Sequence, residues 1–154
     1  ATTEIYTLSY TTLFRSTILL ALDLSSECYI PLEKTLYIKE LLKIETFNVL
    51  HIVNLPSLYT SQAFIANIQE TIYQEGKKKL HDLCEKYDIP ESCQHVSIGS
   101  PLLNIVDFAR KTDTDLIIVG SHSEYHLLPA ALGSTAASLL NKVNCDLLTI
   151  SVKQ

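Results

Sequence analysis

The sequence predicts an α/β domain with a five-stranded parallel sheet and helices on both faces. Short apolar runs typical of strands alternate along the chain with longer segments of helical periodicity. Two of these runs, residues 18–22 and 116–119, are apolar throughout, as expected for strands buried on both faces of a parallel sheet. The 154 residues, 47% of them hydrophobic, suit a single domain with one core.

The first strand is expected at Thr17–Leu22, and residues 23–27 follow it as a loop in which Asp23, Ser25 and Ser26 are candidate helix caps. The next segment is predicted to be a helix with Pro31 in its first turn, where a helix tolerates proline. The evidence for this helix is a set of apolar residues at spacings of three and four: Tyr37, Ile38, Leu41 and Leu42.

The second strand is expected at Phe47–Asn54, and a longer helix follows and ends before Pro90, which cannot continue it. The basic cluster Lys77–Lys79 lies within this helical pattern, where it forms either a solvated face or a docking patch. Gly76 shares the apolar stripe of the helix. The stripe consists of Ile65, Ile68, Ile72, Leu80, Leu83 and Tyr87.

Three further strands are expected, at residues 93–99, at residues 116–120 and at Cys145–Val152. Ser100 can cap a helix whose first residue is Pro101. The apolar face of that helix consists of Leu102, Ile105, Val106 and Ala109. A final helix carries Leu132, Ala136, Leu139, Leu140 and Val143 on one side.

Composition argues against several classes of protein. The net charge of −5 and the lack of a basic stripe disfavour nucleic-acid binding. The apolar runs are much shorter than the roughly 20 residues of a membrane-spanning helix. The cysteines contain no CxxC pair, which disfavours a zinc site or a disulfide framework and favours buried thiols in a reducing cytoplasm. Cys28 lies near an expected helix N-terminus, where a thiolate is favoured, so a redox role is the alternative there.

Residues 120–135 form the candidate ligand site. Gly120 ends a strand, and Gly133 and Ser134 open the last helix. A helix N-terminus offers free N–H groups to a phosphate, and the hydroxyls of Ser134 and Thr135 add donors. Ligands of parallel α/β sheets bind at the carboxyl ends of the strands, where the strand order reverses. Glycine before a helix is also common without any ligand, so both interpretations stay open.

Catalytic signatures are not found in the sequence. It contains no G-x-S-x-G elbow, no H-E-x-x-H motif and no Walker lysine after a glycine-rich loop, which predicts a protein that is not an enzyme. His122, Glu124 and His126 are expected to be solvated or bonded to backbone rather than to bind a metal. His51 and His95 fall in strands, where packing in the core or at the sheet edge is expected.

Several motifs, in matching order and spacing, resemble the universal stress protein family. They are "ILLALDLS" at 18–25, "LHIV" at 50–53, "GSP" at 99–101, "DLIIVGSH" at 115–122, "LGST" at 132–135 and "CDLLTIS" at 145–151. The resemblance implies the strand order 3-2-1-4-5. It also implies a cytoplasmic homodimer that pairs through the last strand, here Cys145–Val152, and unknown protein partners.

Many family members similar to this chain bind ATP, with Mg²⁺, through a Gly-x2-Gly-x9-Gly-Ser/Thr motif. Carried over by this resemblance, the first glycine is Gly120 and the last pair is Gly133 and Ser134, with Thr135 next to them. Ser123 stands where the middle glycine is expected.

The resemblance also implies two adenosine-binding positions. Asp23 matches the aspartate that faces the ribose and adenine, and Ile52 matches the residue whose backbone meets adenine. Two departures act against a triphosphate. Ser123 costs roughly 1 kcal/mol if its position needs a left-handed backbone, and Glu124 brings a negative charge near the phosphates.

Three functions remain open at this point. The first is a stress-response regulator that senses ATP or a related adenine nucleotide. The second is a member of the nucleotide-free branch that acts through protein contacts alone. The third is a weak ATPase or another small α/β enzyme.

Residues 1–16 are expected to be a non-native or disordered head before a single domain at 17–154. They show neither strand alternation nor a helical stripe, and Tyr10–Ser16 resembles the translation of a common sequencing adapter. The alternative is a genuine short arm along the edge of the sheet.

Overall fold

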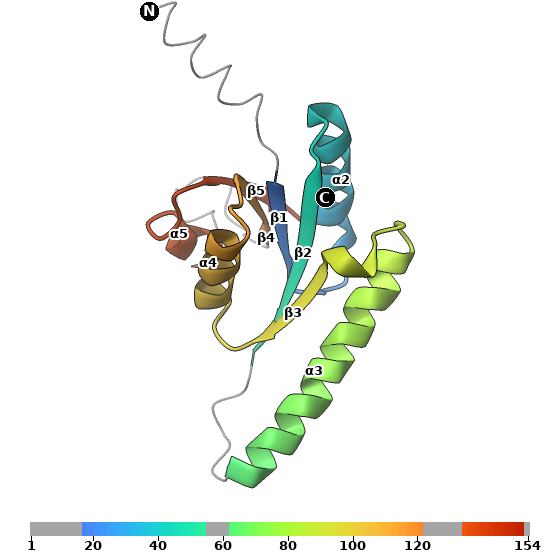
Figure 1. Cartoon of the computed structure of the whole chain (residues 1–154), viewed down its shortest axis with the longest axis vertical. Helices are drawn as coiled ribbons and strands as arrows, with labels where there is room; N and C mark the ends of the chain where they lie inside the picture. Colours follow the sequence, from blue (N-terminus) through green and yellow to red (C-terminus); the bar gives the residue numbers. More distant parts are fainter. Residues whose placement is uncertain (1–16, 55–61, 122–133, 153–154) are drawn as a thin grey trace, which may run out of the picture.

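The computed structural model describes residues 17–54, 62–121 and 134–152, with side chains of the second helix described from residue 68 onward (Figure 1). The head at 1–16 therefore lies outside the described residues. Five parallel strands form one sheet in the order β3-β2-β1-β4-β5, which confirms the predicted fold class and strand order. The strands are β1 (Thr17–Leu22), β2 (Thr46–Val53), β3 (Gln94–Ile98), β4 (Leu116–Ser121) and β5 (Asp146–Ser151).

Helices cover both faces of this sheet (Figure 1). They are α2 (Tyr29–Leu42), α3 (Gln62–Glu85), α4 (Pro101–Lys111) and α5 (Ser134–Leu139), and a short 3-10 turn, η1 (Glu91–Cys93), precedes β3. On the α2 and α3 side the core includes Ile18, Leu20, Leu32, Val49, Leu80 and Ile118. On the α4 and α5 side it includes Leu19, Leu50, Ile105, Ile117 and Leu139.

The central strand β1 is buried along its whole length, as its continuous apolar sequence predicts. It pairs with β2 on one side and with β4 on the other. The amide of Thr17 donates a hydrogen bond to Asp115 Oδ2 at 3.1 Å, across 98 residues of sequence. Because successive crossovers leave β1 in opposite directions, the carboxyl ends of β1 and β4 border the crevice where such sheets bind ligands.

The face of helix α2 that packs on the sheet is not the face formed by the apolar residues that predicted the helix. Its buried residues are Pro31, Leu32 and Thr35. Tyr37 and Leu41 are 68% and 63% exposed, Leu42 is also exposed, and Ile38 packs only partly against the core. Apolar spacing shows that residues share a helix face, but it does not determine which face meets the sheet. The first two turns of α2 make that contact instead.

The turn before α4 confirms the predicted helix start. The Ser100 hydroxyl accepts a hydrogen bond from the Leu103 amide at 3.5 Å, and Pro101 is the first helical residue. Gly99 has φ of +117°, a conformation that favours glycine. The Asn104 side chain donates to the Ser100 carbonyl oxygen at 2.9 Å and so ties the helix to the turn.

The two remaining helices differ in how well the sequence predicted them. Leu80 of the α3 stripe is buried, and Gly76 faces β2 as the stripe predicts. Helix α5 ends at Leu139, so the expected stripe is wrong at Leu140, which is 56% exposed. Val143 packs partly against the core, but it lies beyond the end of the helix.

In the described parts of the chain, each helix is too short or too polar to cross a membrane.

Both strand histidines are held by hydrogen bonds. His51 Nδ1 lies 2.9 Å from the Leu22 carbonyl oxygen, to which a protonated Nδ1 donates. His95 Nε2 lies 3.0 Å from Asn48 Oδ1, and its ring packs on Phe108 with centroids 4.7 Å apart. Burial lowers the pKa of His95, because an apolar environment disfavours the charged imidazolium.

Candidate functional site

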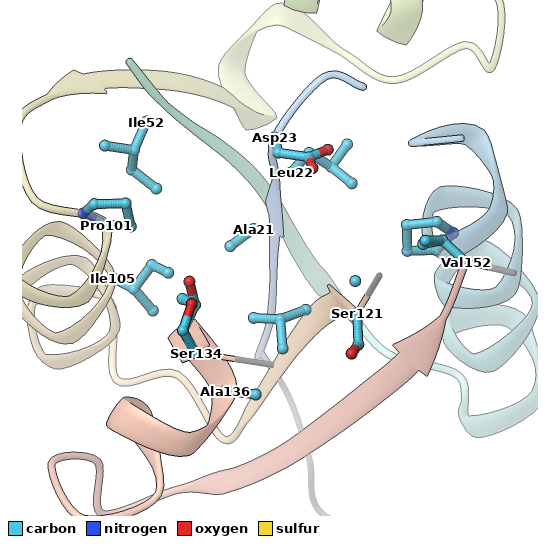
Figure 2. A pocket seen from close by; sticks show the side chains of 14 residues that line it. Ala21, Leu22, Asp23, Ile52, Pro101, Ile105, Ser121, Ser134, Ala136 and Val152 are labelled. Carbon is cyan, nitrogen blue, oxygen red and sulfur yellow. The ribbon is translucent and has the colours of Figure 1, made fainter. Parts of the chain in front are cut away.

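A cavity of about 350 Å³ lies at the carboxyl ends of the central strands (Figure 2). This volume is within the range of small-molecule sites. Strands β1, β2 and β4 contribute residues to the cavity, and Val152, which follows β5, also lines it. The lining residues are Ala21, Leu22, Asp23, Pro31, Ile52, Pro101, Ile105, Val119, Gly120, Ser121, Ser134, Thr135, Ala136 and Val152.

Five residues that the sequence singled out line this one cavity. They are Asp23, Ile52, Gly120, Ser134 and Thr135. The other two predicted site residues, Ser123 and Gly133, lie outside the described residues. The fold thus brings together residues from the ends of β1, β2 and β4 and the start of α5, and their ligand-binding role stays a prediction.

Asp23 places a carboxylate at the cavity wall immediately after β1 (Figure 2). Its Oδ1 accepts a hydrogen bond from the Ser25 amide at 3.0 Å. This bond to the backbone two residues later fixes the loop and the direction of the carboxylate. A carboxylate held in this way is a suitable acceptor for the hydroxyls of a sugar.

An apolar wall lies on the other side of the cavity. Ile52 of β2, Pro101 at the start of α4 and Ile105 one turn later line it together, and Ala21 contributes from β1 (Figure 2). Ile105 is 2% exposed and belongs to the core on the α4 and α5 side of the sheet, so its packing there fixes the position of this wall. Such a wall suits a flat aromatic group, because ring faces gain the most from burying apolar surface.

Gly120 keeps the third side of the cavity open. A Cβ at this position would lie 3.3 Å from Val152 Cγ1 and 3.5 Å from Pro31 Cγ. A larger side chain would therefore meet both residues and occupy part of the cavity. Gly120, next to the last residue of β4, thus helps to set the shape of the cavity.

Apart from Ile52, sequence reasoning missed the apolar part of the site. Pro31, Pro101 and Ile105 were expected only as residues of their helices, and the packing of these helices brings them to the cavity. Ser121 could have been found, because it is the last residue of β4 and the carboxyl ends of strands border such sites.

Positive side chains are missing from the described lining of the cavity. The sequence adds that no lysine or arginine occurs between Lys111 and Lys142, a stretch that includes all of β4 and α5. Neutral hydroxyl and backbone donors therefore dominate the polar part of the described site. Within the described ranges, no group of three or more histidine, cysteine or carboxylate side chains is placed to hold a metal ion.

Cys28 does not have the reactive environment suggested for a helix N-terminus. It lies at the helix N-terminus, as expected, where it is the N-cap residue of α2, but burial raises the pKa of its thiol and the negative charge of Asp23 raises it further. The raised pKa disfavours a thiolate at Cys28, contrary to the expectation for a cysteine near a helix N-terminus. Burial likewise raises the pKa of Cys84 to about 11.

Comparison of the sequence with known proteins identifies the universal stress protein family. The model of the universal stress protein family matches residues 15–151. Universal stress protein A homolog 1 of Coxiella burnetii is 33% identical over 113 residues, which cover 71% of this chain and 78% of that protein.

Solved structures give the same fold. Universal stress protein UspA from Lactobacillus plantarum has a TM-score of 0.69 at 20% identity, covering 88% of this chain and 97% of that one. A universal stress protein in complex with cAMP has a TM-score of 0.55 at 17% identity, covering 90% and 98%. A universal stress family protein from Arabidopsis thaliana with AMP bound has a TM-score of 0.56 at 17% identity, covering 88% and 91%.

Proposed function

This chain belongs to the universal stress protein family, and we propose that it binds an adenine nucleotide in the cavity between the ends of β1 and β4. The observation that carries the proposal is the meeting of Asp23, Ile52, Gly120, Ser134 and Thr135 around one cavity. Neighbours of the same fold with cAMP and AMP bound support the chemical class of the ligand.

The two sides of the cavity suit the two ends of an adenosine. Adenine packs on the wall formed by Ile52, Pro101 and Ile105. The ribose hydroxyls donate to the carboxylate of Asp23, which the Ser25 amide already orients. The phosphate then points toward Ser134 and the other hydroxyls of the site. Mg²⁺ accompanies the ligand if the ligand is ATP, because it neutralises part of the triphosphate charge.

In this proposal the protein acts by binding and not by catalysis. It works in the cytoplasm as a homodimer that pairs through the strand at Cys145–Val152, and nucleotide occupancy sets its contacts with protein partners. A second function, contact with proteins without any nucleotide, is favoured by one feature of the sequence. Ser123 and Glu124 replace residues that the family's ATP-binding motif uses near the phosphates.

Thermal unfolding with and without nucleotide tests the proposal. Millimolar Mg-ATP, AMP and cAMP are added separately, with CMP as the control base. A ligand at 100 times its dissociation constant stabilises the fold by about 2.7 kcal/mol, which raises the melting temperature by roughly 5 to 10 °C. We expect such a rise with at least one adenine nucleotide and none with CMP.

A pair of variants locates the binding. Asp23→Ala removes the carboxylate from the cavity, and we expect it to abolish most of the shift. Glu45→Ala is the matched control, because Glu45 is exposed at the amino end of β2, away from the cavity. If no adenine nucleotide changes the melting temperature, the proposed ligand is wrong and the function by protein contacts alone takes its place.

A further inference from the structure

Strand β3 is the edge of the described sheet on the side opposite β5. It hydrogen-bonds to β2 along one side, from Val49 and Gln94 to Val53 and Ile98. An edge strand presents N–H and C=O groups along its other side, and these groups can pair with an added strand. Its five residues are all partly exposed, so no described element covers them completely.

A groove of about 780 Å³ runs along this edge. Four successive residues of β3 line it: Gln94, His95, Val96 and Ser97. Successive side chains of a strand point to opposite faces of the sheet, so a groove that touches all four follows the strand's free edge. Residues from both α3 and α4 also line it, and these helices lie on opposite faces of the sheet, on either side of β3 (Figure 1).

The α3 wall of the groove is polar and basic. Lys77, Lys78 and His81 line it, together with Tyr73 and Gln74. Both lysines are exposed. Glu91 also lines the groove, and its Oε1 is 3.9 Å from Lys77 Nζ, a long contact that contributes little, while Lys78 adds a second positive charge. The chain carries a net charge of −5, so this wall is a local exception to the charge of the protein.

The α4 wall of the groove is aromatic. Phe108 lines it and packs on the ring of His95 with centroids 4.7 Å apart and planes at 53°. The hydrogen bond between His95 and Asn48 Oδ1 fixes the position of that ring. One wall of the groove therefore suits acidic side chains and the other suits apolar ones.

We propose that this groove binds an extended, acidic segment of a partner protein, which adds to β3 as a sixth strand. Alternate side chains of the added strand point to opposite faces, so acidic residues face Lys77 and Lys78 while the apolar residues between them face Phe108. A segment of five to seven residues, about 17 to 23 Å long, matches β3. The proposal does not depend on a nucleotide in the cavity at β1 and β4.

Binding of a fluorescent heptapeptide, measured by anisotropy at low salt, tests this proposal. The peptide alternates glutamate and valine, and a peptide alternating lysine and valine is the charge control. A third peptide has proline in place of the central valine, which removes one backbone donor and bends the strand. We expect the first peptide to bind at least tenfold more tightly than either of the others, and more weakly at 0.5 M salt.

The lysine cluster provides matched variants. K77E/K78E reverses the charge of the groove wall, whereas K79E makes the same kind of change on the adjacent exposed lysine, which does not line the groove. We expect K77E/K78E to weaken binding of the glutamate peptide at least tenfold and K79E to change it less than threefold. Melting temperatures near that of the wild type establish that both variants fold.

Three results would overturn the proposal. They are failure of the glutamate peptide to bind at millimolar concentration, equal binding of the proline peptide, and equal weakening by K79E. The second result would show that no strand is added, and the third would show that only the general charge of α3 attracts the peptide.

Discussion

Gly76 of α3 lies against Val53 of β2 so closely that a Cβ on Gly76 would be only 2.8 Å from Val53 Cγ2. The same Cβ would be 3.3 Å from Cδ2 of His51. Helix α3 therefore approaches the sheet at a distance that a side chain at this position does not allow.

The first prediction is that Gly76→Ala destabilises the fold although alanine is the better helix former. Alanine gains about 1 kcal/mol in a helix interior, but overpacking of a buried contact costs about 1 to 3 kcal/mol. We expect a net loss of about 1 kcal/mol in the free energy of unfolding, measured with urea. Glu75→Ala, at the exposed neighbouring position, is the control and should change stability by less than about 0.5 kcal/mol. A more stable Gly76→Ala protein would contradict the close contact.

The second prediction concerns pH and His95. Burial lowers the pKa of His95 in the folded protein, so the unfolded chain takes up a proton first as the pH falls. The stability that the neutral imidazole supplies is complete above the unfolded pKa of about 6.5 and declines below it, until the folded pKa is reached.

Urea unfolding at pH 7.5 and pH 5.5 measures this effect. We expect His95→Gln to lose less stability between the two pH values than the wild type does. His81→Gln, at an exposed position on α3, is the control and should alter the pH dependence less than His95→Gln. An unchanged pH dependence in His95→Gln would show that His95 does not carry the effect.

The third prediction is an order of thiol reactivity. Cys84 is buried, and at pH 8 a thiol with a pKa of about 11 is about 0.1% thiolate. Cys28 is also buried with a raised pKa, whereas Cys93 is partly exposed. Iodoacetamide should therefore label Cys93 of the native protein well before Cys28 and Cys84, as mass spectrometry of peptides can measure. Early labelling of Cys28 would restore the redox role that its environment now disfavours.

The fourth prediction concerns the number of phosphates, given a nucleotide in the cavity. The described lining has no lysine or arginine, so each added phosphate brings negative charge without a cationic partner. We expect AMP to bind at least as tightly as ATP when Mg²⁺ is removed with EDTA, measured by calorimetry. Mg²⁺ should improve ATP binding and leave AMP binding nearly unchanged. Much tighter binding of metal-free ATP would point to a cationic partner outside the described lining.

The sequence was a good guide to the strands and a poorer one to the helix faces. The continuous apolar run of β1 predicts burial on both faces, because any strand in the middle of a covered parallel sheet needs it. Tyr37 and Leu41 have helical spacing, yet they are exposed, because the face that meets the sheet depends on how the whole helix docks.

The candidate site was predictable to a similar degree. Gly120 could be identified because it lies next to the last residue of β4, at a strand end that borders such sites, and Asp23, directly after β1, because the family resemblance implied it. Pro31 and Ile105 could not, since they reach the cavity only through the packing of α2 and α4. The reactivity of Cys28 was misjudged for a related reason. Its position in the helix was right, but its burial is a property of the folded core.

The hydrogen bond between Thr17 and Asp115 has a consequence for how the chain folds during synthesis. Strand β1 leaves the ribosome long before β4, because Asp115, the residue just before β4, lies 98 residues after Thr17. Until then only the β2 edge of β1 can be paired, and the edge that later meets β4 is exposed to pairing with other chains. The cavity needs both strands, and it therefore forms only when nearly the whole chain has been made.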